Sequence, residues 1–244
     1  MRVTGMRLMK HPERLGSILS VWAHPDDETY LAGGLMASAS DRGHRVVCAT
    51  ASAGERGTAD PTAWPPARLA PVRCREIAAA MAALGVDEHE IAGFPDGDLG
   101  ACDAAGAAWA RRLIEAVRPD TILTFGADGM TFHPDHVAVH RWVTGAWNDL
   151  GRPCRLLYAA TSVAYLDRFG ELLEQWQVYM SDDRPTGVAV ADLAVDLHLY
   201  GPDLDRKLVA LRAMASQTAG PIADLGLDEY AALVAEEAFV DACA

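Results

Sequence analysis

The stretch VWAHPDDETYLAGG, residues 21–34, joins the end of an apolar run to the start of a helical pattern. Residues 16–23, GSILSVWA, are short, apolar and rich in strand-forming side chains, which predicts a buried strand. Residues 28–43 carry apolar side chains at helical spacing and end in a glycine, which predicts a helix. Three consecutive acids, at 26–28, therefore stand where a strand meets its helix.

The alternation of strand and helix continues along the chain. Further strands are expected at 44–52, 88–94, 120–126, 154–162 and 186–195, and helices at 68–86, 104–119, 135–150 and 201–217. Such alternation predicts an α/β fold, a Rossmann-like, doubly wound and mostly parallel sheet with helices on both faces. We expect a single domain over residues 1–244, with an irregular C-terminal part from about residue 161 onward.

Composition narrows the range of partners. Apolar residues make up 50% and charged residues 23% of the 244 residues, which is typical of a globular protein. The formal net charge of -13 argues against nucleic acid and against an anionic membrane surface as partners. No G-x-G-x-x-G follows the first strand, so a dinucleotide-binding protein is disfavoured.

The expected location is the cytoplasm. The five cysteines are odd in number and widely spaced, which favours reduced thiols. No apolar run is long enough to span a membrane. A signal peptide is not expected, because the first 20 residues carry charges throughout, at Arg2, Arg7, Lys10, Glu13 and Arg14.

A second polar cluster follows another predicted strand. Residues 133–136, HPDH, come after the strand at 120–126, and ligands bind beyond the C-terminal strand ends of such sheets. Two histidines and one carboxylate form the ligand set of a hydrolytic zinc that leaves one position for water, and such a metal lowers the pKa of water to about 7. His24 and Asp27 can converge on one ion, and His136 can complete the set. Asp26 and His133 then remain for proton transfer or oxyanion stabilisation.

A simpler interpretation exists for each cluster taken alone. Acids in the first turn of a helix complement the helix dipole and cap free N–H groups, so the acids at 26–28 and Asp135 could be capping residues. The occurrence of two such clusters at two strand ends of one sheet favours a metal site. His140 follows His136 at helical spacing but is expected to be an ordinary helix residue.

The paired motifs AHPDDE and HPDH closely resemble those of the PIG-L/LmbE-like zinc N-deacetylases, which remove acetyl groups from N-acetylglucosamine-containing substrates. The resemblance covers about residues 17–217. It implies that His24, Asp27 and His136 bind one Zn²⁺, that Asp26 is the general base and that His133 stabilises the oxyanion. Iron or cobalt could occupy the same ligands.

Further stretches match this family in order. SAGERGT (52–58), RCREIAAAMAALGV and FPDGDL (94–99) resemble its loop after the second strand, its R-x-x-E helix and its D-G loop. The resemblance directs Arg73 towards the substrate and Asp96 towards sugar hydroxyls. Glu55 and Arg56 of the first loop are further candidates for substrate binding, with loop or surface charges as the simpler interpretation.

Two positions depart from the family pattern. Met214 stands where a late helix commonly carries a histidine, and Thr131 stands where the mycothiol-related branch has a tyrosine. The expected function is a zinc-dependent hydrolase that removes an acetyl group from an N-acetylated amino sugar or similar small amide. The alternatives are an amidase for a larger acyl or thiol-conjugate amide and a non-catalytic sugar-binding relative.

The stretch 161–186 is rich in aromatic side chains, and two interpretations stay open. Tyr165, Phe169, Trp176 and Tyr179 could form a rim over the pocket. They could equally form the surface of a homo-oligomer, because aromatic residues are enriched at interfaces.

Overall fold

Five parallel strands form the centre of the sheet in the computed structural model, which describes residues 6–8 and 15–243. They are β2 (Ile18–Trp22), β3 (Val46–Ser52), β4 (Glu88–Phe94), β5 (Thr121–Phe125) and β6 (Arg155–Ala160). Their spatial order is β4-β3-β2-β5-β6. The expected α/β fold with a mostly parallel sheet is confirmed.

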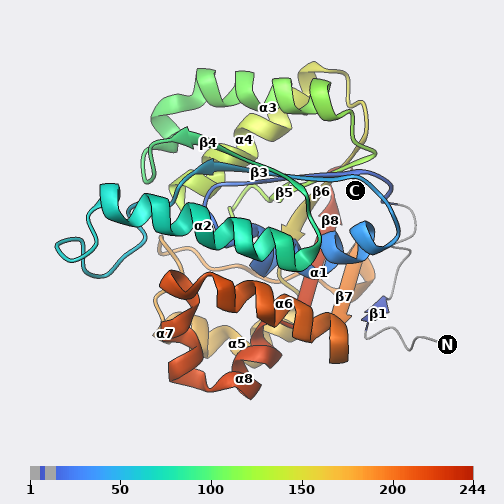
Figure 1. The fold of residues 1–244 in the computed structure, drawn as a ribbon. Helices are drawn as coiled ribbons and strands as arrows, with labels where there is room; N and C mark the ends of the chain where they lie inside the picture. The colour runs from blue at the N-terminus through green and yellow to red at the C-terminus, as the bar shows by residue number, and fades with distance from the viewer. Residues whose placement is uncertain (1–5, 9–14, 244) are drawn as a thin grey trace.

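Helices cover both faces of this sheet. They are α1 (Asp27–Asp41), α2 (Pro66–Leu84), α3 (Asp103–Val117) and α4 (Pro134–Asp149), with the short 3₁₀ helix η2 (Leu99–Cys102) before α3. α3 and α4 lie on one face, and α1 and α2 lie on the other (Figure 1). The four helices begin or end within two residues of the predicted limits, because their apolar faces and their Gly and Pro boundaries are local signals.

The central strand β2 pairs with β3 on one side and with β5 on the other. The chain places β3 and β4 on one side of β2 and then returns to add β5 on the opposite side. β2 and β5 therefore flank the point where the strand order reverses. In doubly wound sheets the crevice at this point is the usual ligand site, so the loops after β2 and β5 face the same space.

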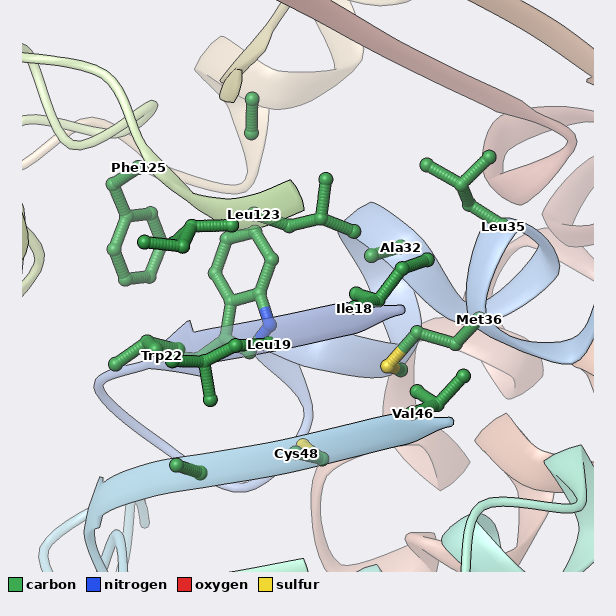
Figure 2. Close-up of a cluster of buried hydrophobic side chains, with 14 of the residues drawn as sticks. Ile18, Leu19, Trp22, Ala32, Leu35, Met36, Val46, Cys48, Leu123 and Phe125 are labelled. Carbon is green, nitrogen blue, oxygen red and sulfur yellow. The ribbon is translucent and has the colours of Figure 1, made fainter. Parts of the chain in front are cut away.

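The buried core fixes the position of these two strand ends. Trp22, the last residue of β2, packs edge-to-face on Phe125, the last residue of β5, with ring centroids 4.9 Å apart. Figure 2 shows this pair within a cluster to which α1 contributes Ala32, Leu35 and Met36. Aromatic pairs of this geometry add to the stabilisation from burial alone, so both loops start from a well-packed base.

Residues 161–244 differ from the expectation of an irregular part. They contain α5 (Val163–Gln175), η3 (Val190–Asp192), β7 (Val195–Leu199), α6 (Gly201–Ala213), α7 (Ala215–Leu225), α8 (Leu227–Val234) and β8 (Glu236–Asp241). β8 pairs antiparallel with β6, β7 pairs antiparallel with β8, and β1 (Met6–Leu8) forms the edge. These strands extend the sheet to eight, so the C-terminal segment is part of the same sheet.

Two local predictions in this segment were wrong. The strand expected at 186–195 contains η3, and β7 begins only at Val195. The helix expected at 201–217 is interrupted at Met214, whose side chain is buried. The final segment contains both a helix and β8, a strand that the sequence pattern did not indicate. Antiparallel pairing between distant segments decides β7 and β8, and local periodicity does not report it.

A buried ion pair joins the C-terminal segment to α1. Lys207 Nζ donates to Glu237 Oε1 at 2.7 Å and to the carbonyl oxygen of Tyr30 at 2.8 Å. The Glu237 carboxylate accepts from the backbone N–H groups of Gly34 (2.6 Å) and Leu35 (2.8 Å). The pair therefore provides hydrogen-bond partners for the carbonyl group of Tyr30 and the N–H group of Gly34, which are four residues apart in α1. Both charged side chains are fully enclosed.

The described residues include no helix that combines the length and apolar character needed to cross a bilayer. All five cysteines lie within this part of the chain, and all five are free. Arg2, Lys10, Glu13 and Arg14, on which the expectation about a signal peptide partly depends, lie outside the described residues.

Candidate metal centre

Two histidines and a carboxylate converge beyond the ends of β2 and β5. His24 follows β2, Asp27 is the first residue of α1, and His136 lies in the first turn of α4. His24 Nδ1 lies 3.2 Å from His136 Nε2 and 3.5 Å from Asp27 Oδ2, and His136 Nε2 lies 3.4 Å from Asp27 Oδ1. Ligand atoms of a tetrahedral zinc with bonds of about 2.0–2.2 Å lie about 3.3–3.6 Å apart. The three side chains therefore fit one small divalent ion.

The second nitrogen of each ring is held by the protein. His136 Nδ1 lies 2.8 Å from the carbonyl oxygen of Gly129, so this nitrogen carries the proton and Nε2 is free to bind a metal. His24 Nε2 lies 3.1 Å from Asp96 Oδ1 and 3.2 Å from Asp135 Oδ2, so Nε2 donates and Nδ1 is free. Both free nitrogens belong to the converging set.

The pKa values of the ligand side chains reflect this crowding. Burial would lower the pKa of His24, but its hydrogen bonds with Asp135, Asp27 and Asp96 raise it well above the usual value. Burial lowers the pKa of His136 to about 4. Burial would raise the pKa of Asp27, but the two histidines hold it well below the usual range. A bound cation would take the place of the proton on His24 Nδ1, because a histidine binds a metal only in its neutral form.

Asp135 has a structural role that the sequence did not reveal. Its carboxylate accepts from the backbone N–H groups of Gly97 (2.7 Å) and Leu99 (3.0 Å) in addition to its contact with His24. It does not cap α4, because the N-cap of that helix is His133, whose Nδ1 accepts from the Asp135 N–H at 3.1 Å. The partners of Asp135 are distant in the chain, so no local pattern could indicate them.

Asp26 is not a capping residue either. It occupies the N-cap position of α1 with φ 130° and makes no side-chain hydrogen bond to the helix. Its Oδ2 accepts from Arg73 Nη2 at 3.1 Å. Burial raises the pKa of Asp26 to about 6, although the charge of Arg73 opposes this shift. A strained backbone and a raised pKa beside a metal site are typical of a functional carboxylate.

Arg73 lies under the loop that carries Asp26. Its side chain is 3% exposed, and it donates to the carbonyl oxygens of Gly54, at 2.7 Å, and Pro25. The sequence directed this guanidinium towards the substrate. The structure instead places it against protein groups, where it joins the loop after β3 to the backbone beside Asp26.

The other three candidates for substrate binding contact one another. Asp96 is 5% exposed, and its carboxylate accepts from the backbone N–H of Arg56 at 2.6 Å as well as facing His24. Glu55 Oε1 accepts from the Asp96 backbone N–H at 3.1 Å. The side chains of Glu55 and Arg56 remain partly or fully exposed, whereas Asp96 is enclosed.

His133 lies beside the converging set. Its ring centroid is 4.9 Å from that of His24 and 4.9 Å from that of His136. Because its Nδ1 accepts from a backbone N–H, the proton of the neutral ring is on Nε2. Burial lowers the pKa of His133, and the neighbouring His24 lowers it further. The side chain is therefore a neutral hydrogen-bond donor at neutral pH.

Two further polar side chains lie beside the centre. Glu28 is fully buried and accepts from the Asp26 backbone N–H at 3.2 Å, and burial raises its pKa to about 8. His140 Nδ1 lies 2.9 Å from the carbonyl oxygen of Phe125, and it belongs to neither of the two groups of metal-ligand side chains in the described residues. The second of those groups consists of His24, His133 and Asp135. A metal ion there would compete for the Asp135 carboxylate with the two backbone N–H groups that already donate to it.

The family model for PIG-L, described as GlcNAc-PI de-N-acetylase, matches residues 19–147, just over half of the chain. The chain belongs to the PIG-L family. A named relative from Streptomyces avermitilis, 1D-myo-inositol 2-acetamido-2-deoxy-alpha-D-glucopyranoside deacetylase, is 39% identical over 51% of this PIG-L chain and about half of its own length. A deacetylase of the same name from Acidothermus cellulolyticus is 31% identical over 83% of this chain and 80% of its own.

Solved structures of two deacetylases share the fold. N,N'-diacetylchitobiose deacetylase from Pyrococcus horikoshii matches with a TM-score of 0.62 and 20% identity, over 94% of this chain and 84% of that chain. The antimicrobial reagent A40926 pseudoaglycone deacetylase matches with a TM-score of 0.66 and 23% identity, over 92% and 96% of the two chains. The family model and the named relatives confirm the predicted family, and these structures confirm the predicted fold.

The two residues that depart from the family pattern, Thr131 and Met214, lie in different environments. Thr131 Oγ1 lies 3.5 Å from His136 Nδ1, on the loop between β5 and α4. Met214 is buried at the end of α6 and presents no polar group. Gln217, three residues later, donates to the carbonyl oxygen of Gly57 at 3.0 Å and so contacts the loop that carries Glu55.

Proposed function

We propose that this protein is a metal-dependent N-deacetylase that hydrolyses the acetamide of a small N-acetylated amino sugar. The observation that carries the proposal is the converging set of His24, Asp27 and His136 with Asp26 directly beside it. The names of the relatives support the same reaction class. They do not favour the two alternatives, an amidase for larger acyl groups and a non-catalytic relative.

Zn²⁺ is the ion that the donor set suits best, with His24 Nδ1, His136 Nε2 and the Asp27 carboxylate as its three protein ligands. Iron or cobalt would suit the same donors. When bound, such an ion polarises a carbonyl group and lowers the pKa of water. Asp96 and Asp135 accept from the His24 ring and orient it for this task.

Asp26 is the proposed general base. Its carboxylate does not cap the helix and does not belong to the ligand set, so it is available to accept a proton from the attacking water. A pKa of about 6 leaves it largely ionised at neutral pH and still basic enough to take that proton. The same group then returns the proton to the leaving amine nitrogen, and acetate is released.

His133 is the proposed oxyanion partner. Its Nε2–H can donate to the oxygen of the acetyl carbonyl as negative charge develops there. The lowered pKa keeps the ring neutral, so it contributes a hydrogen bond without adding a positive charge next to the cation.

Four side chains have proposed roles around the substrate. Glu55 and Arg56 are accessible and can bind sugar hydroxyl groups. Arg73 and Asp96 are enclosed and act through their neighbours, Arg73 on Asp26 and Asp96 on His24. The partner is thus a small molecule; neither a membrane nor a nucleic acid is required.

The experiment compares Asp26→Asn with the wild-type protein in metal content and in acetate release from N-acetylglucosamine derivatives. The variant should bind metal normally and lose about 10²–10⁴-fold in kcat. Asp87→Asn, an exposed position before β4, is the matched control and should behave as wild type. Full activity of Asp26→Asn would exclude the proposed base, and absence of acetate release from the wild-type protein would exclude the function.

A further inference from the structure

A cavity of about 340 Å³ opens from the metal centre towards the C-terminal segment. Asp27 and His136 form part of its wall, and Thr131 lies next to them. The remaining wall comes from α1, the loop before α4, the end of β6, α5 and its following turn, α7, α8 and β8. The cavity is therefore continuous with the site of the proposed reaction.

The wall is mainly apolar. Its side chains include Leu31, Met130, Leu173, Trp176 and Val178. Besides Asp27, two carboxylates line it, and both are engaged with protein groups. Glu237 is paired with Lys207, and Glu236 accepts from the Ser162 hydroxyl at 2.5 Å. An apolar wall with few free polar groups favours a hydrocarbon or aromatic ligand over a sugar or an inositol.

The polar candidates for sugar binding lie elsewhere. None of Glu55, Arg56, Arg73 and Asp96 lines the cavity, and neither does Asp26. Two different environments thus meet at the metal centre, a polar one from the loops after β3 and β4 and an apolar one from the C-terminal segment.

The size of the cavity excludes the acetyl group as its sole occupant. Release of acetate requires room for one methyl group, whereas pockets of about 300–1,000 Å³ enclose ligands of drug size. The large apolar volume must therefore serve another part of the substrate.

We propose that this cavity binds an apolar aglycone, an alkyl chain or aromatic group carried by the N-acetylated amino sugar. The proposal rests on the proposed deacetylase function and names its substrate class. It distinguishes this chain from an enzyme whose sugar carries only a polar polyol, because a polyol would lose its hydrogen bonds to water against Leu173 and Trp176.

The test measures kcat/KM of the metal-loaded protein for acetate release from methyl, butyl and octyl glycosides of N-acetylglucosamine. Burial of each methylene should raise kcat/KM about fourfold until the cavity is filled. A parallel series keeps the methyl glycoside, lengthens the N-acyl group from acetyl to octanoyl and measures the free amine, which every member releases on hydrolysis. A rise confined to this second series would overturn the proposal, because the cavity would then serve the acyl group.

A cavity variant gives an independent readout. Leu173→Trp fills part of the cavity with a larger side chain. It should reduce the ratio of kcat/KM for the octyl glycoside to kcat/KM for the methyl glycoside at least tenfold. Glu171→Trp, exposed on the same helix and outside the cavity, should leave that ratio as in wild type. An unchanged ratio in Leu173→Trp would contradict the assignment.

The outcomes separate this inference from the proposed function. Acetate release that is independent of glycoside chain length would overturn the aglycone subsite and leave the deacetylase intact. If no glycoside is hydrolysed, calorimetry of the same compounds with the metal-loaded protein still decides the inference: affinity that rises from methyl to octyl supports it, and equal or absent binding rejects it.

Discussion

Arg73 Nη2 lies 3.1 Å from Asp26 Oδ2, so a buried cation contacts this carboxylate. Among the three acids at 26–28, Asp26 is the one that is not a candidate metal ligand and is not fully enclosed. The backbone of Asp26 has a positive φ that non-glycine residues rarely adopt, and such a conformation persists only where surrounding contacts hold it. Arg73 provides one such contact, and its charge lowers the pKa of the proposed base.

Replacement of Arg73 should change the pH dependence of the reaction. Burial raises the pKa of Asp26 to about 6 and Arg73 lowers it, so removal of the positive charge raises it further. Since the base must be ionised, the acid limb of kcat/KM should move to higher pH in Arg73→Met, by roughly one unit or more. Arg73→Lys keeps the charge, and its limb should stay closer to wild type. An identical pH profile in Arg73→Met would show that the contact does not tune the base.

Asp135→Asn should weaken metal binding. The carboxylate accepts from His24 Nε2, so its loss removes a partner that fixes the ring with Nδ1 towards the ion. Groups in this position typically contribute 10–100-fold to metal affinity, and a zinc titration with a competing chelator measures the change. Asp149→Asn, an exposed position near the end of the same helix, is the control. Equal affinities for the two variants would mean that Asp135 only anchors the loop around Gly97.

Removal of the metal should abolish activity and leave the fold intact. The strand ends beneath the cluster are held by the Trp22–Phe125 contact and the surrounding core, which need no ion. Far-UV circular dichroism of the chelated protein should match that of the loaded protein, while the melting temperature falls because the ion binds only the folded state. Loss of the helical signal on chelation would indicate a structural ion.

Lys207→Met should destabilise the protein by about 3–5 kcal/mol, because it leaves the enclosed Glu237 without its cation. The double variant Lys207→Met/Glu237→Gln should cost less than the sum of the two single variants, because no unpaired charge remains. Urea unfolding of all four proteins measures this difference. Simple additivity would contradict a direct coupling between the two side chains.

The parallel half of the fold was predictable because its signals are local. Apolar runs, helix boundaries and the two motifs at 24–28 and 133–136 indicated strands, helices and the metal cluster. The sequence could not show that Asp135 serves His24, or that Arg73 points into the protein, because both depend on side-chain contacts between distant segments. The aromatic residues of the stretch 161–186 were open to two interpretations, a rim over the pocket or an oligomer surface. Of these residues, Tyr165 and Trp176 line the cavity, which supports the first interpretation for those two.

The C-terminal segment was the least predictable part. β8 follows α8 after a single residue and pairs with strands on both sides, a placement that no periodic pattern records. The sequence does not indicate the interruption at Met214 either, because apolar side chains continue at helical spacing on both sides of this residue. At β8, tertiary pairing overrides local propensity.

The family model ends at residue 147 and includes the whole metal cluster, whereas Tyr165, Leu173 and Trp176 of the cavity lie beyond it. The proposed reaction centre thus lies within the part that the family model matches, whereas much of the wall of the proposed aglycone subsite lies after it. If both proposals hold, substitutions of the lining residues after residue 160 should change the preferred aglycone and leave the proposed reaction centre as it is. A chimera that joins the first part of this chain to the C-terminal segment of a relative should therefore inherit the relative's preference together with the original hydrolytic centre.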